Sequence, residues 1–432
     1  MTGRETVLAG FGIETITPDR PLPLAGVGEN WVGREVLDDL HVRALYLAHE
    51  DVEIVLVSLD VLYVSRSFCC QLEHWLTQKH SVPADHLFVA ATHTHCAPLL
   101  LDTSFGGLSA DLKFVAEVIG KTKLAINAAI GQTMEASIEV AMAPASVSIN
   151  RRARRLDRSA LGRLRLKRPM ANRPNFSAPV DNTVRALWLR AHSAADPDIV
   201  LVGAGCHPSI LRGEMYSADF PGHIEDALNA RCKRPVRAIF LQGFSGNTRA
   251  KLLETAPLAI WPAGRAFEWA FDHSRFRKDS LVSDAEWVAG MIAAAVAGAR
   301  RSPPADVCLS AAVTELDLPI DARDSERKVE RKVPFRIRTW AVSDQVRLLG
   351  LEGEVFSEFA LWLAADDEAT GTMTIPVGCV GGIAGYVPTA ASLAEGGYEI
   401  DRSRDLFNLP NRFAPEIEQV LKAGIRSHLR QS

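Results

Sequence analysis

The chain has 432 residues, of which 47% are hydrophobic and 23% are charged, and its formal net charge is -4. This length supports one large or two ordinary domains with a sizeable core, and the weakly acidic balance gives no overall reason to expect a nucleic-acid partner. The longest apolar stretch, 288–299, is too short to span a bilayer, and the first residues lack the basic-then-apolar pattern of a secretion signal. A cytoplasmic protein without membrane insertion is therefore expected.

Apolar runs of strand type and helix type alternate along the first third of the chain. β-Rich runs bounded by turn signals predict strands, and apolar residues at helical spacing predict helices. The longer helix is expected to begin at Ser109, a good N-cap residue, and to stop near Gly131. The expected order is a β-hairpin (42–48 and 53–58), a helix (68–79), a strand (86–91), a helix (109–129) and a strand (135–143).

Residues 150–179 are the least globular part of the chain, with arginine and lysine dense from Arg151 to Arg173 and prolines at three positions. A solvated loop or hairpin is the interpretation that this composition favours. A basic run of this kind can also bind phosphate or nucleic acid. A non-catalytic protein that binds an anion or nucleic acid through this run therefore stays open as an alternative.

Three apolar runs in the second half of the chain end abruptly in polar or glycine residues: 198–204, 237–242 and 346–351. His207 follows the first of them and Glu354 follows the third. Because open α/β sheets place ligands at the carboxyl ends of strands, one sheet edge is predicted to gather His93, His207 and Glu354. The helices expected in this half are 283–301, opened by a capping box from Ser283 to Glu286, then 355–365 and 414–429.

His93 and His95 stand two residues apart where the predicted strand 86–91 ends. Residues i and i+2 of a strand point to the same face, and neutral imidazole is a good zinc ligand. A hydrolytic zinc needs about three or four nitrogen or oxygen ligands and a position for water. His93, His207 and Glu354 can supply three, although each alone also fits a strand end, a turn or a helix start.

Five short motifs follow one another along the chain. They are Ala-Thr-His-Thr-His at 91–95, Asn150-Arg151, the single His207 after a buried strand, Gly353-Glu354-Val355, and Gly-Tyr-Val-Pro-Thr at 385–389 with Glu-Gly-Gly-Tyr at 395–398. In this order and spacing they resemble the catalytic domain of the neutral/alkaline, non-lysosomal ceramidases. The likeness runs from about Ala9 to beyond Tyr398.

The resemblance implies an amide hydrolase that uses a metal-activated water. His95 would be its acid/base residue, Arg151 and Tyr398 would face the oxyanion, and the backbone around Gly26 would line the substrate pocket. As ligands of one Zn²⁺ per chain, the resemblance implies His93, His207, Glu354 and Tyr386.

One segment departs from the ceramidase pattern. Residues 243–250 match a Gly-Asp-x-Ser-Pro turn whose serine lies in the ceramidase active site, but Asn247 and Arg249 stand at the corresponding positions here. Ser245 lies four positions too early to replace that serine and is interpreted as a turn residue. Arg249 places a cation where ceramidases have a hydroxyl, which suits substrate binding through a carboxylate. An outward-pointing, salt-bridged arginine is the alternative.

The sequence therefore predicts an α/β fold, with a mixed β-sheet core flanked by helices and without the C-terminal immunoglobulin-like domain of ceramidases. A single domain is expected over 1–432, with an insertion near 251–282. The expected partner is a small or medium-sized amide, with an ester as second choice. A metal-dependent amidohydrolase on a (β/α)8 barrel is the other enzyme hypothesis. It would make both His93 and His95 ligands, and the early hairpin argues against it.

Overall fold

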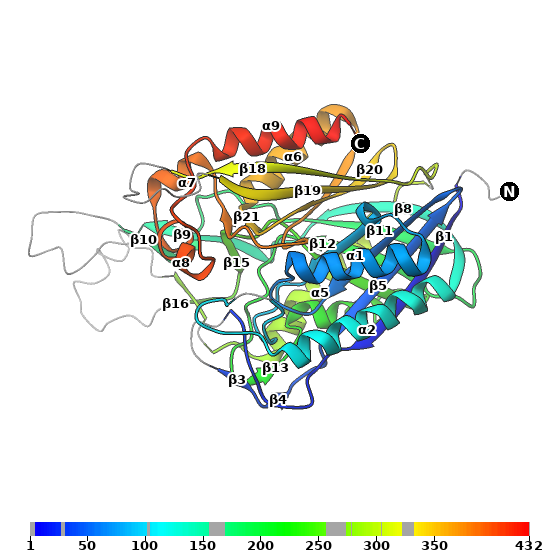
Figure 1. Cartoon of the computed structure of the whole chain (residues 1–432), viewed down its shortest axis with the longest axis horizontal. Coiled ribbons are helices and arrows are strands. Elements are labelled where there is room, and N and C mark those ends of the chain that lie inside the picture. The colour runs from blue at the N-terminus through cyan, green and yellow to red at the C-terminus, as the bar shows by residue number, and fades with distance from the viewer. Residues whose placement is uncertain are drawn as a thin grey trace, which may run out of the picture.

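Two β-sheets pack face to face between layers of helices (Figure 1). The computed structural model describes residues 5–26, 31–101, 104–154, 169–255, 274–277, 279–303, 305–321 and 332–431. The first sheet has eight strands, in the order β14 (Val236–Gln242), β12 (Asp198–Ala204), β11 (Thr183–Ala191), β8 (Thr133–Pro144), β1 (Val7–Thr15), β5 (His41–His49), β6 (Val52–Leu59) and β7 (Leu87–Ala91). The second sheet has four strands, in the order β18 (Ser310–Pro319), β19 (Lys332–Ser343), β20 (Val346–Leu351) and β22 (Met373–Val377).

The space between the two sheets is filled by aliphatic and aromatic side chains. Leu56 and Phe88 of the first sheet and Trp340 and Leu348 of the second belong to this cluster, and all four are at most 1% exposed. Full burial of one such side chain contributes about 1.5–3 kcal/mol. The middle of strands such as β6 (residues 54–57) and β12 (residues 199–202) is therefore continuously apolar, because both faces are covered.

Helices cover the outer face of each sheet. Those on the first sheet are α1 (Arg66–His80), α2 (Leu112–Gly131), α3 (Ile224–Asn229) and α5 (Val282–Gly298). Those on the second sheet are α6 (Ser357–Thr370) and α9 (Ile417–Leu429), which lie along the top of Figure 1. The predicted α/β fold with a mixed sheet flanked by helices is confirmed, with a second sheet that the sequence did not predict.

The predicted hairpin is confirmed as β5 and β6, whereas two predicted helix caps are wrong. Helix α2 is capped by Asp111, whose carboxylate accepts a hydrogen bond from the Phe114 N–H at 2.8 Å, so it begins three residues after Ser109. Helix α5 is capped through Asp284, which accepts from the Leu281 N–H at 2.8 Å. In both cases a carboxylate near a helix start competes successfully with the serine that the sequence favoured.

The (β/α)8-barrel alternative is wrong. Within the first sheet only β6 with β7 and β12 with β14 pair in parallel, while the other neighbours are antiparallel. The sheet instead curves, so that strands from its two ends approach each other. The Ser58 hydroxyl of β6 donates a hydrogen bond to the Phe240 carbonyl of β14 at 2.8 Å.

The arginine-rich segment begins and ends in strands. β9 (Ser148–Arg154) pairs antiparallel with β10 (Met170–Asn175), as expected for a hairpin, and also with β15 (Thr248–Ala250). Residues 155–168 lie outside the described part of the chain. So do 256–273 and 278 of the predicted 251–282 insertion, whose described ends pair as β16 (Leu253–Thr255) and β17 (Ser274–Phe276). Among the described residues, no helix combines the length and the apolar character needed to cross a membrane.

Histidine 428 makes the attachment of α9 sensitive to pH. Its ring lies between the hydroxyls of Thr314 (2.8 Å) and Thr339 (2.7 Å) on the second sheet, and burial lowers the pKa of His428 to about 4. The unfolded chain therefore binds this proton more readily than the folded protein between about pH 6.5 and pH 4. We expect the free energy of unfolding to fall across that window by about 1–2 kcal/mol from this group, after allowance for solvent screening.

Urea unfolding of the wild type and of His428→Gln at a series of pH values measures this effect. Glutamine does not titrate, so the variant should lose less stability between pH 6.5 and pH 4. Parallel pH dependences for the two proteins would show that His428 does not contribute.

Candidate metal centre and active site

The candidate site lies where strands from the two ends of the first sheet meet a loop of the second sheet. This loop, 378–381, follows β22. Its Cys379 carbonyl accepts from the Ala91 N–H at the end of β7 (3.2 Å), and its Gly378 N–H donates to the Gln242 carbonyl at the end of β14 (2.8 Å). These bonds hold three strand ends together without a continuous sheet edge.

The prediction that one edge of one sheet gathers His93, His207 and Glu354 is therefore wrong in detail. Glu354 follows β20 of the second sheet, and the two histidines follow β7 and β12 at opposite ends of the curved first sheet. His93 and His95 also do not share a strand face, because the chain leaves the extended conformation at His93 (φ 70°). Their rings nevertheless lie together, with centroids 5.2 Å apart.

Three imidazoles are held in one tautomer by backbone carbonyls. The Nδ1 atoms of His93, His95 and His207 lie 2.9, 2.8 and 3.3 Å from the carbonyls of Leu62, Gly26 and Ser245, respectively. A carbonyl only accepts, so each Nδ1 carries a hydrogen, and each Nε2 points away from that carbonyl and presents a lone pair when the ring is neutral. A partner on the far nitrogen is the usual way in which a metal-binding histidine is oriented.

The Nε2 atoms of these three rings converge without a matching donor. The ligand nitrogens of His93, His95 and His207 all lie within 4.8 Å of one another, and His95 Nε2 is 3.0 Å from His207 Nε2. His93 Nε2 and Glu354 Oε2 are buried and have no hydrogen-bond partner among the described residues. They lie 3.4 Å apart. Buried acceptors that face one another in this way need a cation or a proton between them, so this group can hold a metal ion.

A short parallel strand pair sets Glu354 beside Tyr386. β21 (Glu354–Val355) pairs with β23 (Tyr386–Val387), with Glu354 opposite Tyr386. Gly353 precedes Glu354 with φ 84°, and an added Cβ there would lie 2.4 Å from the Gly385 carbonyl oxygen. This glycine lets the two segments approach closely enough to place both side chains on the site.

Tyr63 is a site residue that the sequence analysis missed. It lies in the segment after β6, is 2% exposed, and donates its hydroxyl hydrogen to Glu354 Oε1. This bond leaves Oε2 as the oxygen that faces the histidines. Its only sequence signal is its place shortly after an apolar run, which many core tyrosines share.

The charges in the site favour a cation beside Glu354. Burial alone would raise the pKa of Glu354, but His93 and Arg151 hold it below its usual value, so the carboxylate is ionised. Burial disfavours the His93 cation, yet Cys379 and Glu354 outweigh it and raise the pKa of His93 well above its ordinary value. Burial and neighbouring positive charge lower the pKa of His95 to about 3 and that of His207 well below normal, so both rings are neutral.

Arg151 reaches the site from β9 and is 5% exposed. Its Nε donates to Glu399 Oε1 (2.9 Å), and its Nη2 donates to the Gly246 carbonyl (2.8 Å) and to the Tyr386 hydroxyl (3.0 Å). Its Nη1 makes no hydrogen bond to any residue in the described ranges and is the donor left for another oxygen. Glu399 also accepts from the buried Arg152 at 2.7 Å, so one carboxylate orients two guanidinium groups.

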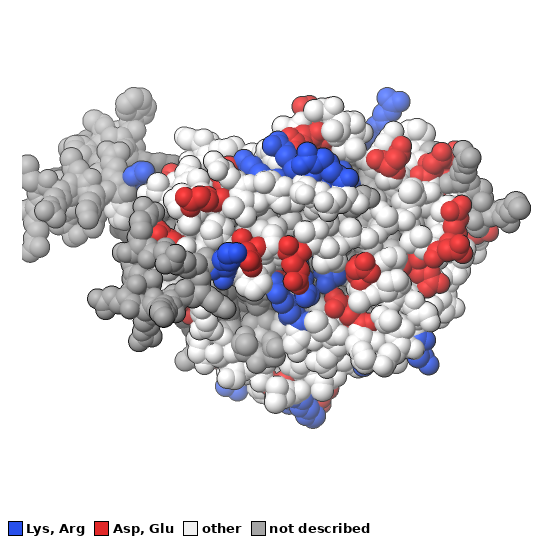
Figure 2. Space-filling model, turned by 45° about the horizontal axis from the view of Figure 1, so that its top comes forward, with Lys and Arg blue, Asp and Glu red and all other residues white. Residues whose placement is uncertain are grey.

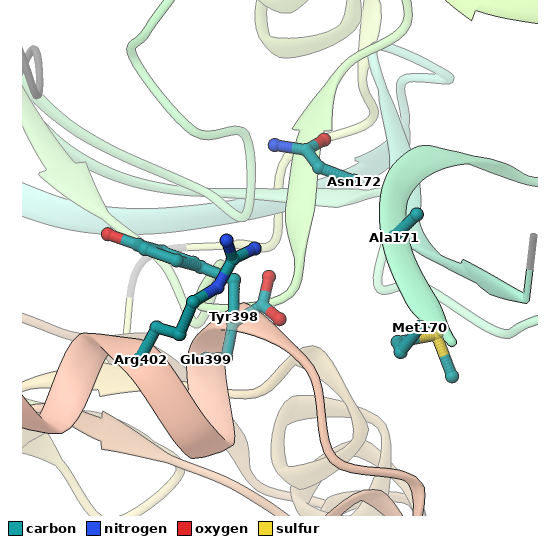
Figure 3. Close-up of a pocket in the computed structure, with 6 residues that line it drawn as sticks. All are labelled: Met170, Ala171, Asn172, Tyr398, Glu399 and Arg402. Atoms are coloured by element: carbon teal, nitrogen blue, oxygen red, sulfur yellow. The ribbon is translucent and has the colours of Figure 1, made fainter. Parts of the chain in front are cut away.

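Tyr398 joins the site to a cavity. Its ring centroid lies 5.9 Å from that of Tyr386, and at 36% exposure it is open to solvent. Figure 3 shows Tyr398 and Arg402 projecting from the helical turn η4 (Tyr398–Arg402), with Met170, Ala171 and Asn172 of β10 across from this turn. Between them lies a cavity of about 240 Å³, lined by Met170, Ala171, Asn172, Tyr398, Glu399 and Arg402.

The residues of the divergent turn take different positions. Asn247 is fully buried and caps α6, because its side chain accepts from the Ser357 N–H (2.9 Å) and donates to Glu358 (2.7 Å). Ser245 contributes its carbonyl to His207, while its hydroxyl accepts from Gln242, so it is a structural turn residue. Arg249 is partly buried beside Phe276, and the predicted alternative of a salt bridge is absent among the described residues.

Replacement of Tyr63 by phenylalanine tests the support of Glu354. The variant would remove one hydrogen-bond donor from a buried carboxylate while keeping the ring that packs against His93, 5.1 Å away between centroids. We expect metal affinity to fall about 10- to 100-fold, as for other residues that orient a ligand. Competition titration with a chelating dye measures this, with thermal unfolding as the control for folding. Unchanged affinity would exclude a role for Tyr63 in orienting Glu354.

No family model matches the chain, and a search of curated proteins found no relative. Solved structures do share its architecture. The crystal structure of neutral ceramidase from Pseudomonas aeruginosa matches with a TM-score of 0.71 and 14% identity, over 95% of this chain and 72% of that chain. The chain has the fold of a neutral ceramidase. A structure described as ceramidase complexed with C2 agrees, with a TM-score of 0.68 and 14% identity over 95% of this chain and 73% of that chain.

The ceramidase-like fold explains how motifs far apart in the sequence meet. His93, His95, His207, Glu354, Tyr386, Arg151 and Tyr398 are linked by the contacts described above. Gly26 joins them through its carbonyl, which accepts from His95. Arg249 stands apart, because no hydrogen bond or ion pair connects it with the others within the described ranges, although the charge of Arg151 helps to lower its pKa.

Proposed function

We propose that this chain is a zinc-dependent hydrolase that cleaves an amide bond in a small or medium-sized substrate. The observation that supports this most strongly is the convergence of three imidazole nitrogens with one buried carboxylate oxygen that has no hydrogen-bond partner among the described residues. The ceramidase-like fold is consistent with it. An ester is the second choice of substrate.

The donor set suits one zinc ion. His93, His207 and Glu354 would hold it through two nitrogens and one oxygen, with the Tyr386 hydroxyl as a fourth ligand beside Arg151. Such a mixed set would also accept manganese or iron, so zinc is the proposed rather than the required metal. When bound, zinc would polarise the substrate carbonyl and lower the pKa of water.

His95 would move the proton. The Gly26 carbonyl holds its Nδ1–H, so the Nε2 lone pair faces the site and is free to accept a proton from water. The protonated ring can then donate to the leaving nitrogen as the C–N bond breaks. Gly26 would therefore line the substrate pocket, and its carbonyl would fix the tautomer of His95.

Arg151 and Tyr398 would stabilise the negative charge that grows on the carbonyl oxygen. Glu399 and the Gly246 carbonyl fix the Arg151 guanidinium before any substrate arrives, which leaves Nη1 as a preorganised donor. The exposed Tyr398 hydroxyl is the second donor. The cavity beyond Tyr398 would then receive the acyl part of the substrate, since it lies on the carbonyl side of the site.

The nucleic-acid alternative has little support from the described residues. Arg151 and Arg152 are buried and share Glu399, so neither is available to a phosphate backbone. On the face shown in Figure 2, lysine and arginine side chains lie in small groups beside acidic ones. A binding protein of this kind would be expected to present a continuous basic surface.

A hydrolysis screen tests the proposed function. The protein would be loaded with one equivalent of zinc and incubated with ceramides, N-acyl amino acids and matching esters, with and without a chelator. We expect release of amine that stops on chelation and returns with added zinc. Stoichiometric zinc without hydrolysis of any amide or ester would contradict the proposal, and so would activity that survives complete removal of metal.

A further inference from the structure

Arg249 and Arg212 lack, among the described residues, the anionic partners that the buried arginines have. Arg249 lies on β15 next to β9, is partly buried, and stacks its guanidinium 4.7 Å from the centroid of the Phe276 ring. Arg212 is exposed in the loop between β12 and β13 (Met215–Tyr216). Neither makes a hydrogen bond or ion pair with the parts of the chain that the structure describes. By contrast, Arg151 and Arg152 share Glu399.

The positive charges of Arg212 and Arg151 act on the Arg249 guanidinium. Burial, together with the charges of Arg212 and Arg151, lowers the pKa of Arg249 to about 9. Arg212 follows Leu211, whose carbonyl accepts a hydrogen bond from the Cys96 thiol at 3.4 Å, so the backbone at Arg212 lies near that of His95. Arg249 pairs with Ile149, so it lies on the same face of this small sheet as Arg151, which is two residues further along β9. An anion placed between the two guanidiniums would relieve this repulsion and supply the missing hydrogen-bond acceptors.

We propose that Arg249 and Arg212 bind a carboxylate on the amine side of the substrate, which makes the substrate class N-acyl amino acids with a free carboxylate. This inference rests on the proposed function. Water adds to the acyl carbon, the C–N bond breaks, and one water proton passes to nitrogen, so the products are a carboxylic acid and an amino acid.

The position of Arg212 decides which side carries the carboxylate. His95 is the residue that would serve the leaving nitrogen, and the Arg212 segment adjoins it through the contact between Cys96 and Leu211. Arg151 and Tyr398 serve the carbonyl oxygen and adjoin Tyr386 on the other side. A planar guanidinium can hold a carboxylate through two parallel hydrogen bonds. The stacked Phe276 ring limits the motion of the Arg249 guanidinium.

The test compares an N-acyl amino acid with its terminal carboxamide, which has the same shape and no charge. We expect Arg249→Met to lower kcat/KM for the carboxylate by about 10- to 100-fold and for the carboxamide by less than about threefold, with Arg212→Met acting in the same direction. Arg430→Met, at the exposed end of α9, is the matched control and should change neither value. Equal losses on both compounds, or equal wild-type rates on both, would overturn the inference.

Binding without turnover separates this inference from the proposed function. Calorimetric titration of the N-acyl amino acid into the wild type and into Arg249→Met should show affinity that the variant loses, whether or not hydrolysis occurs. Tight binding without hydrolysis would contradict only the proposed function. Hydrolysis of neutral amides with no preference for the carboxylate would contradict only the present inference.

Discussion

Replacement of His93 by alanine is expected to abolish zinc binding and hydrolysis together. His93 is fully buried, its Nδ1 is fixed by the Leu62 carbonyl, and its Nε2 has no partner among the described residues and lies 3.4 Å from Glu354 Oε2. Loss of a residue that only orients a metal ligand through a hydrogen bond commonly lowers metal affinity by about 10- to 100-fold. Loss of the ligand itself should therefore lower the affinity by more than about 100-fold. Elemental analysis after gel filtration measures the bound zinc.

The matched control is His192→Ala, which removes a half-exposed histidine on the surface. It should retain one zinc per chain and full activity. Thermal unfolding shows whether each variant is folded, because an unfolded variant would lose zinc whether or not His93 is a ligand. If folded His93→Ala still binds one equivalent of zinc with wild-type affinity, the proposed metal centre is wrong.

The residues of the site were easier to predict from the sequence than the path by which they meet. His93, His207 and Glu354 lie in short segments whose ligand chemistry can be read locally, whereas Tyr386 was implied only by the resemblance to ceramidases. Their convergence depends on the curvature of the first sheet and on the 378–381 loop, which are long-range features without a local pattern. The second sheet was missed for the same reason, since its β20 gives the same apolar signal as a strand of the first sheet.

Supporting residues were harder to predict. Tyr63 and Glu399 act through hydrogen bonds with residues about 290 and 250 positions away, and neither belongs to a motif that implies such a role. The helix caps failed for a different reason. Asp111 and Ser109 are both good N-cap residues, and the choice between them is made by packing and by the ion pair of Asp111 with Arg20.

Replacement of His95 by glutamine distinguishes an acid/base residue from a metal ligand. The geometry brings its Nε2 into the same group as His93 and His207, so His95 is placed to be either. We propose the acid/base role. On that basis His95→Gln should retain one zinc per chain and lose about 10²- to 10⁴-fold in kcat, the usual contribution of general acid–base catalysis.

Two measurements on the same preparation of His95→Gln make the result decisive. Zinc content near one equivalent with a low kcat supports proton transfer by His95, because glutamine fills the position without being able to exchange a proton near neutral pH. Loss of zinc to the extent seen in His93→Ala would make His95 a third nitrogen ligand and contradict its proposed role. Full activity would contradict both roles, because it would show that the partly buried imidazole facing His207 is dispensable to the chemistry.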